Sequence, residues 1–363
     1  MRKKIAINHG YVDKGLLLLT IALAIFGVVM VYDASSASAY KDFGDKLYYA
    51  RNQSLWFVIG IIAMGVLSRV DYHWLTKMSF FILSLSTIFL ILVLVPGMGT
   101  SLLGAKRWIT LFGFNFQPAE LTKIAAVLFF ARIMRTKPKL PIIAAVLLAL
   151  GVLIMLEPDL GTTVVIVGSG FILYFVAGAR IHELILAVPV ILLISAGLII
   201  NSEYRRSRIL TFLNHQSDPL GTSYQVRQIL LALGSGGISG LGLGQSRQKY
   251  LFLPEVATDS IFAVVAEELG FIGAVTLILM LLGLFLRGLK IAWHAPDREG
   301  MLLATGIVSF LAVQTIINLG AMVSLLPLTG VPLPFISYGG SSLVVSLSSI
   351  GILLNISRQT KEC

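Results

Sequence analysis

Residues 16–31 read LLLLTIALAIFGVVMV, an apolar run without a single charge, and runs of this kind decide the class of fold. A helix needs about 20 predominantly apolar residues to cross a bilayer. Such segments recur at 16–33, 54–68, 78–96, 117–134, 141–156, 161–178, 184–201, 259–288, 301–324 and 336–357. The pattern therefore predicts an all-α fold, a polytopic membrane protein with ten transmembrane helices.

The composition agrees with this class. The 363 residues are 56% hydrophobic and only 13% charged, and the mean hydropathy is +0.89, whereas about 25% of the residues of a typical soluble domain are charged. The opening stretch, MRKKIAINHGYVDKG, is basic and carries no cleavage pattern, so we expect the first apolar run to remain as a helix. The single cysteine, Cys363, allows neither a disulfide within the chain nor a cysteine metal site.

The distribution of positive charge predicts the topology. Ten helices would place both termini on one side, and the short segments of that side would hold 16 Lys and Arg against five in the short segments of the other. Short cytoplasmic loops carry the excess of Lys and Arg, so we expect an N-in, C-in arrangement. The net charge of +10 then reflects this bias and attraction to anionic membrane lipids, and no nucleic-acid partner is expected.

The polar outer segments are 97–118, 157–162, 202–258 and 325–341. We interpret the whole chain, 1–363, as a single integral-membrane domain with a large extracytoplasmic loop, 202–258, between helices 7 and 8. That loop is too short and too rich in glycine to bury a core of its own. Within it, residues 224–233 (YQVRQILLAL) read as an amphipathic helix in the membrane interface.

Two motifs combine charges with apolar surroundings. Lys106 and Arg107 precede Trp108, and they suit either an interfacial anchor or a clamp for phosphate or pyrophosphate. Glu120 and Lys123 lie three residues apart on one face of an apolar helix. An unpaired charge there is costly, so we expect the two to pair, either to fix packing or to line a functional pocket.

Three further motifs lie at the other outer segments. Asp159 either caps the helix that follows or lies at the mouth of the bundle near Lys123. The stretch 329–342 (TGVPLPFISYGGSS) breaks the helical pattern, either as a plain break or as a nest that binds an anion. The glycine-rich stretch 234–270 delivers Asp259 to the start of an apolar segment, as an N-cap, a general base or a ligand of a divalent cation.

Several kinds of site are excluded by pattern. The His182-Glu183 pair has no second histidine four residues on, so no zincin motif is present. The five histidines show no metal-ligand spacing, and neither a Gly-x-Ser-x-Gly elbow nor a kinase or nucleotide-binding signature occurs.

The motifs together resemble the SEDS family (RodA, FtsW and SpoVE) over nearly the whole chain. The matching blocks are Lys106-Arg107-Trp108, Gln117-Pro118-x-Glu120-x-x-Lys123, Pro158-Asp159-Leu160-Gly161-Thr162, Tyr224-Gln225, GSGG at 234–237, Leu253-Pro254-Glu255 to Thr258-Asp259, Glu267-Glu268-Leu269-Gly270 and 329–342. The run GLGLGQSRQK with LPEVATD is more similar to FtsW and SpoVE than to RodA. Ala257 stands where a histidine often precedes Thr-Asp, and Glu157 stands where glutamine is common.

The resemblance implies a peptidoglycan glycosyltransferase of the bacterial cytoplasmic (inner) membrane, with an extracytoplasmic active face. Lipid II would be polymerised into a β-1,4-linked nascent glycan with release of undecaprenyl pyrophosphate. Expected partners are a class B penicillin-binding protein, which is a transpeptidase, and divisome or elongasome proteins. A divalent cation, Mg or Mn, is expected near Asp259, Glu120 or Asp159. The sequence does not choose between elongation, division and sporulation.

Roles follow for individual residues. We expect Asp259 to be catalytic, as general base or metal ligand. Residues expected to bind substrate or pyrophosphate are Lys106, Arg107, Lys123, Glu120, Asp159, Tyr224, Gln225, Arg247, Lys249, Glu255, Ser337, Tyr338, Gly339, Gly340, Ser341 and Ser342. The alternatives are a lipid II flippase, which should carry charges through the midplane, and a pure scaffold, which would not explain Glu120 and Lys123.

Overall fold

The computed structural model describes residues 12–102, 105–111, 114–136, 140–183, 222–250 and 254–360, together with 185–186, 189, 197, 206, 208, 210 and 212. Helices occupy nine of the ten predicted apolar segments, and the tenth, 184–201, lies outside the described residues apart from single positions. The helices are α1 (Lys14–Phe43), α2 (Tyr48–Leu67), α3 (Tyr72–Lys77), α4 (Ser79–Leu94), α5 (Pro118–Met134), α6 (Leu140–Leu156), α7 (Leu160–Val176), α10 (Thr222–Ser235), α11 (Ile261–Trp293), α12 (Arg298–Met322) and α13 (Gly340–Gln359).

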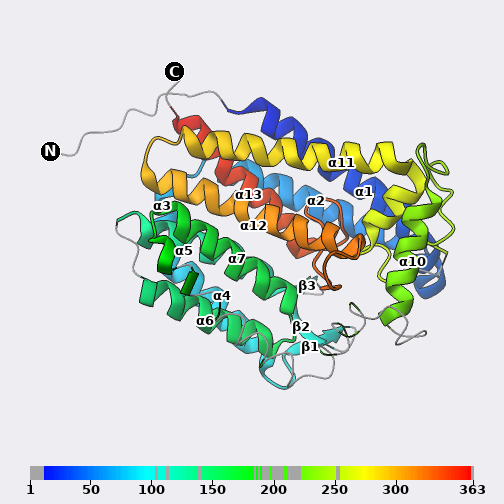
Figure 1. Cartoon of the computed structure of the whole chain (residues 1–363), viewed down its shortest axis with the longest axis horizontal. Coiled ribbons are helices and arrows are strands. Elements are labelled where there is room, and N and C mark those ends of the chain that lie inside the picture. Colours follow the sequence, from blue (N-terminus) through cyan, green and yellow to red (C-terminus); the bar gives the residue numbers. More distant parts are fainter. Residues whose placement is uncertain are drawn as a thin grey trace.

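Most helices run along the long axis of the molecule (Figure 1). Five of them, α1, α2, α11, α12 and α13, are long and apolar enough to cross a membrane, and α4, α6 and α7 are shorter apolar helices. The start of α1 and the end of α13 lie at one end of the bundle, which we call the termini end (Figure 1). The opposite end, which carries the β-sheet and α10, is called the sheet end.

The centre of the bundle is formed by α12 and α13. The apolar span of α12 is 78% buried and that of α13 is 83% buried. The span of α2 is only 17% buried, so α2 lies at the outside of the bundle. The contact between α13 and α2 is close because Gly351 lies against backbone: a Cβ there would be 2.5 Å from the carbonyl oxygen of Met64. Small residues allow such an approach between membrane helices.

A three-stranded antiparallel sheet covers part of the sheet end. It consists of β1 (Gly99–Leu102), β2 (Ala105–Leu111) and β3 (Phe114–Phe116), with β2 in the middle. The mostly helical architecture is confirmed, but the sheet departs from the expected all-α fold, because we assigned 97–118 to a polar outer segment without strands. The alternation of residues such as Trp108, Ile109 and Thr110 is too short to distinguish a strand from a loop by periodicity.

The helix α10 contains the predicted amphipathic segment. Val226, Ile229 and Ala232 are buried, whereas Leu231 is more than half exposed. The helix runs across the sheet end, transverse to α11 (Figure 1). Its location in a membrane interface stays a prediction.

The long helix α11 is broken at Gly270, whose φ of 67° and ψ of −168° are not helical. The glycine-rich segment 236–242 binds the backbone groups at this break: the amide of Leu241 donates to the carbonyl of Glu267 at 3.0 Å, and the amide of Phe271 donates to Gly237 at 2.9 Å. A Cβ at Gly270 would lie 2.2 Å from the amide nitrogen of Gly240. The glycines of this stretch therefore serve close packing between loop and helix.

We expect Gly270→Ala to destabilise the protein, because alanine would adopt a positive φ and meet the backbone of Gly240. Backbone strain alone costs about 1–3 kcal/mol. The measurement is the midpoint of thermal unfolding in detergent. Gly65→Ala is the matched control, since a Cβ at that position in α2 meets nothing within 4 Å. Equal midpoints for the two variants would contradict the packing described here.

Candidate active site

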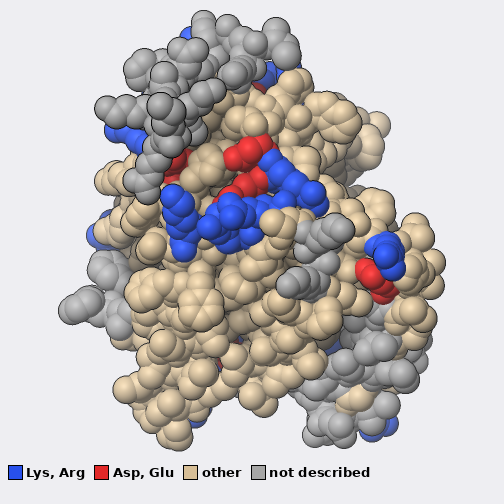
Figure 2. Space-filling model, turned by 90° about the vertical axis from the view of Figure 1, so that its left-hand side faces the viewer, with Lys and Arg blue, Asp and Glu red and all other residues tan. Residues whose placement is uncertain are grey.

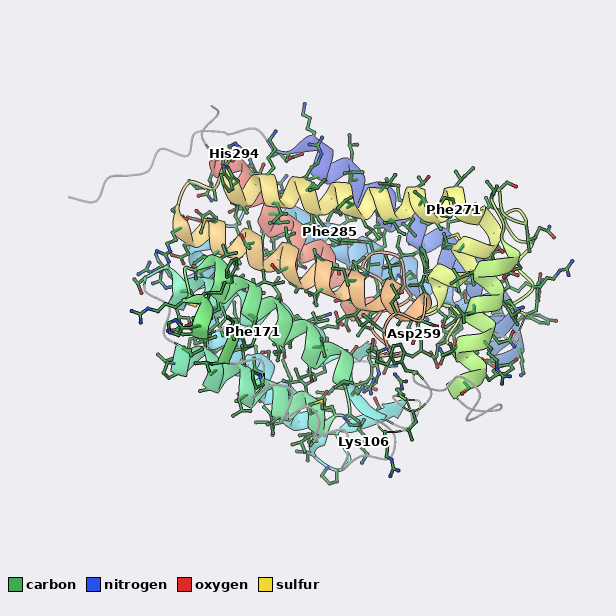
Figure 3. All side chains as sticks on the ribbon, in the orientation of Figure 1. Lys106, Phe171, Asp259, Phe271, Phe285 and His294 are labelled. Atoms are coloured by element: carbon green, nitrogen blue, oxygen red, sulfur yellow. The ribbon has the colours of Figure 1, made fainter. Side chains whose placement is uncertain are left out.

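Asp259 lies in the turn that precedes α11, at the sheet end, near the end of α12 (Figure 3). Asn318 of α12 fixes this turn, because its Nδ2 donates both to the carbonyl of Asp259 at 2.9 Å and to that of Val331 at 2.8 Å. The two bonds hold Asp259 against the segment 328–339.

The carboxylate of Asp259 does not cap the helix. The N-cap position is Ser260, and no side chain makes a capping hydrogen bond there. The hydroxyl of Thr258 is 3.3 Å from Oδ1 of Asp259 and 2.9 Å from Oε2 of Glu255. Burial raises the pKa of Asp259 to about 6, and the charge of Glu255 adds to this effect, while Arg208 opposes it. A buried carboxyl that caps no helix and has such a pKa is a candidate acid or base.

Arg208 is a site residue that the sequence reasoning missed. Its Nη1 donates to the carbonyl of Leu328 at 2.6 Å, and its charge acts on Asp259. Gly330 lies between the two groups: a Cβ there would be 3.9 Å from Oδ2 of Asp259 and 4.0 Å from Nη1 of Arg208. In the sequence Arg208 was only one of six basic residues of the long loop, and no motif distinguished it.

The predicted pair of Glu120 and Lys123 is formed in α5. Lys123 Nζ lies 2.8 Å from Oε1 of Glu120, and both side chains are buried. The ammonium also donates to Oε1 of Gln314 at 2.6 Å, and Nε2 of Gln314 donates to the carbonyl of Pro332 at 2.8 Å. The pair therefore supports, through α12, the same segment that Asn318 holds. Gln314 was not foreseen, because an amide in an apolar helix carries no pattern.

Asp159 caps α7, which is one of the two roles that the sequence allowed for it. Its Oδ1 accepts from the amide of Thr162 at 3.0 Å, and its Oδ2 accepts from the hydroxyl of Thr162 at 2.9 Å and from Nε2 of Gln117 at 3.4 Å. The backbone N–H of Gln117 donates to Oγ of Ser341 at 3.1 Å. The start of α5, the start of α7 and the start of α13 are thereby connected.

Lys106 and Arg107 differ in their surroundings. Both belong to β2, at a point where the pairing with β1 is irregular: Trp108 pairs with Thr100 and Lys106 with Ser101, so Arg107 has no partner in β1. Lys106 is exposed (Figure 3), whereas Arg107 Nε donates to the carbonyl of Glu157 at 3.0 Å and its Nη2 donates to that of Pro158. Arg107 thus holds the turn between α6 and α7, and only part of its guanidinium remains for a ligand.

Glu157 in that turn is buried, and neither carboxyl oxygen has a hydrogen-bond partner among the described residues. Burial, with a further contribution from the charge of Asp159, raises its pKa to about 9, while Arg107 acts in the opposite direction. The side chain is therefore a neutral acid near pH 7. In that state it resembles the glutamine that we noted as common at this position.

The expected anion nest at 337–342 is largely occupied by the protein itself. The amide of Ser337 donates to Leu333 at 3.0 Å, that of Tyr338 to Ala257 at 2.8 Å, and that of Gly339 to Oε1 of Gln53 at 3.3 Å. Gly340, Ser341 and Ser342 form the first turn of α13, where amides have no partner within the helix. Only that helix start keeps the chemistry of an anion site.

The remaining predicted residues divide into two places. Gln225 of α10 reaches the site, since its Nε2 donates to Oγ of Ser260 at 3.2 Å, and Tyr224 precedes it. Lys249 is instead buried in a separate ionic cluster, with its Nζ 2.8 Å from Oδ1 of Asp33 and 2.8 Å from Oε1 of Glu268. Arg247 next to it has an exposed side chain. Lys249 therefore holds the glycine-rich loop to α1 and α11.

Within the described part of the chain, no three His, Cys, Asp or Glu side chains gather as a metal site. Glu255 and Asp259 are two carboxylates joined through Thr258. Magnesium is commonly held by one or two carboxylates and by phosphate oxygens of the substrate. The donor set fits that mode and does not fit a cation held by protein alone.

Comparison with known proteins identifies the family and agrees with the fold. The sequence profile of the FtsW, RodA and SpoVE family, described as cell cycle protein, matches residues 14–362. Stage V sporulation protein E of Bacillus subtilis (strain 168) is 42% identical over 358 residues, which are 96% of this chain and 98% of that protein. A probable peptidoglycan glycosyltransferase FtsW of Geobacter metallireducens is 43% identical over 360 residues, covering 96% and 95% of the two chains.

Two solved structures have the same fold. One chain of a structure described as the structural coordination of polymerization and crosslinking by a peptidoglycan synthase complex aligns with a TM-score of 0.79 and 29% identity, over 95% of this chain and 97% of that one. The rod shape determining protein RodA of Thermus thermophilus aligns with a TM-score of 0.71 and 27% identity, over 97% and 98%.

We expect Lys123→Met to destabilise the protein by about 3–5 kcal/mol, because it leaves Glu120 charged and unpaired in a buried place. The double variant Glu120→Gln with Lys123→Met removes both charges and should recover most of that loss. Thermal unfolding in detergent measures the two effects. A double variant no more stable than Lys123→Met alone would contradict a buried pair of this kind.

Proposed function

The chain belongs to the FtsW, RodA and SpoVE family of cell cycle proteins, and we propose that it is a peptidoglycan glycosyltransferase that polymerises lipid II. The names of its relatives support the activity. The observation that carries the assignment of the site is Asp259: it is buried, it caps no helix, and its pKa of about 6 lies near the working range of a general base.

The proposed reaction joins two lipid-linked disaccharides. The 4-hydroxyl of the acceptor N-acetylglucosamine attacks the anomeric carbon of the N-acetylmuramic acid at the growing end. Asp259 accepts the hydroxyl proton, the new glycosidic bond forms, and the bond to undecaprenyl pyrophosphate breaks. A single displacement of this kind inverts the α-linked donor to a β-linked product.

The leaving pyrophosphate needs positive charge at the site. Arg208 is the first candidate, because its charge acts on Asp259 and both side chains lie beside Gly330. Arg107 and the first amides of α13 lie at the connected segments, and fixed donors stabilise charge that develops during the reaction. Lys123 and Glu120 act as positioning residues through Gln314. A magnesium or manganese ion, held by Glu255 together with the pyrophosphate, would neutralise further charge.

We place the sheet end on the extracytoplasmic face of the bacterial cytoplasmic membrane, in the N-in, C-in arrangement with ten helices. Figure 2 shows the termini end, where Lys and Arg side chains surround a few carboxylates. Arg132 and Arg135, both 3.3 Å from Oε2 of Glu299, belong to this end. An excess of Lys and Arg favours the cytoplasmic side.

The partner we propose is a class B penicillin-binding protein, the transpeptidase that would crosslink the new strands, within a divisome or elongasome. Support comes from the likeness to a chain of a peptidoglycan synthase complex. The likeness to a sporulation protein and to FtsW proteins is greater in sequence than that to RodA, which favours a role in division or sporulation.

Asp259→Asn removes the proposed base and leaves the fold intact. We expect the rate of glycan polymer formation from lipid II to fall by about 10²- to 10⁴-fold, the usual contribution of general acid–base catalysis. The assay uses the full chain with its partner in detergent, where a flippase would have no measurable product. Asp71→Asn, an exposed carboxylate at the start of α3 and far from the site, is the control. Normal polymer from the Asp259 variant would exclude the base, and no polymer from the unchanged chain would exclude the function.

The rate should depend on pH through Asp259. A base must be deprotonated, and with a pKa of about 6 only about a tenth of the carboxyl is ionised at pH 5, so the rate there should be about tenfold lower than at pH 8. An aspartate of the ordinary pKa, 3.8, would remain mostly ionised at pH 5. Initial rates across this range, with folding checked at each pH, measure the effect. A flat profile down to pH 5 would contradict the role of burial.

A further inference from the structure

Aromatic side chains cluster where α1 is connected to α2. Phe43 stacks on Tyr48, with ring centroids 3.9 Å apart and planes inclined by 13°. Tyr49 lies edge-on to both rings, at 5.8 Å from Phe43 and 5.4 Å from Tyr48. The three rings therefore pack against one another as a single cluster.

The cluster is continuous with the candidate active site. Tyr49 lies edge-on to Tyr338, with centroids 5.0 Å apart. The amide of Tyr338 donates to the carbonyl of Ala257 at 2.8 Å, two residues before Asp259. We call Phe43, Tyr48, Tyr49 and Tyr338 the aromatic run; it leads from an exposed turn to the turn of the proposed base.

The outer part of the run remains open. Phe43 remains 50% exposed, even though its ring contacts those of Tyr48 and Tyr49. Its rim is polar: Asp42 and Lys46 are exposed, and Asp45 pairs with Arg51 at 2.7 Å. A purely apolar occupant, such as a lipid tail, would leave these charged groups without water.

A membrane anchor is the plain alternative, because tyrosine and tryptophan gather at both membrane interfaces. Anchoring alone gives no reason for rings that contact one another and lead to Tyr338. A sugar ring has an apolar C–H face and a rim of hydroxyls, which suits a partly exposed aromatic ring with carboxylates and cations around it.

We propose that the aromatic run binds the sugar rings of the growing glycan strand beside Asp259. The inference rests on the proposed function, which supplies such a strand as the product. The run would keep the strand on the protein between successive additions, so it determines the length of the product.

The first experiment measures binding without any reaction. The probe is a lipid-free, uncrosslinked tetrasaccharide of alternating N-acetylglucosamine and N-acetylmuramic acid, added to the full chain in detergent and followed by saturation-transfer NMR. Loss of one aromatic contact is worth about 0.5–1.5 kcal/mol, so Phe43→Ala and Tyr48→Ala should each weaken binding by about two- to tenfold. Tyr48→Phe should retain the affinity.

Phe271→Ala is the matched control, because Phe271 is 67% exposed at the same end (Figure 3) and belongs to no aromatic cluster of the described residues. The control should bind the tetrasaccharide as the unchanged chain does. Equal affinities for the Phe43, Tyr48 and Phe271 variants, or no detectable binding by the unchanged chain, would overturn the proposal.

The second experiment measures the length of strands made from lipid II. Phe43→Ala and Tyr48→Ala should yield shorter strands than Phe271→Ala. Shorter strands together with unchanged tetrasaccharide affinity would overturn the proposal, since the rings would then act on something other than sugar. Failure of the unchanged chain to consume lipid II would refute the proposed function, whereas the binding experiment is decided independently of it.

Discussion

Polar groups between membrane helices must find their partners within the protein, because lipid offers none. The segment 328–339 shows how this constraint organises the sheet end. Its two prolines and two glycines disfavour a helix, so its carbonyls lack helical partners. Arg208 donates to Leu328, Asn318 to Val331 and Gln314 to Pro332. The side chains that satisfy this backbone are the same ones that hold Asp259 and Lys123 in place.

The same constraint means that the buried carboxyls of the sheet end differ in their partners and in their protonation. Glu120 is paired with an ammonium, and Asp159 is held by a helix start and by two side chains. Glu157 has no partner among the described residues and is neutral near pH 7. Asp259 lies between these cases, since burial and Glu255 raise its pKa while Arg208 restrains it. The surroundings, more than the residue type, therefore decide which carboxyl can exchange a proton.

The helices were predictable because apolar length is a local property of the sequence, and the pair of Glu120 and Lys123 was predictable from helical spacing. The strand of Lys106 and Arg107 was not, and these adjacent residues have different surroundings, since Lys106 is exposed whereas Arg107 binds the turn at 157–158. The break at Gly270 was missed because the residues on both sides of it favour a helix. Arg208 and Lys249 were misjudged for one reason: their partners, Leu328 and Asp33, are more than 100 positions away in the sequence.

The segment that unites the site comes late in the chain, and this affects biosynthesis. Asp259, Asn318 and Gln314 can reach their final positions only after residues 328–339 have been made. That segment in turn is fixed by α13, the last described helix, which packs along α2 from early in the chain. A nascent chain on the ribosome therefore lacks an assembled centre until α13 joins α2. A product truncated before residues 328–339 would retain Asp259 without the partners that hold it.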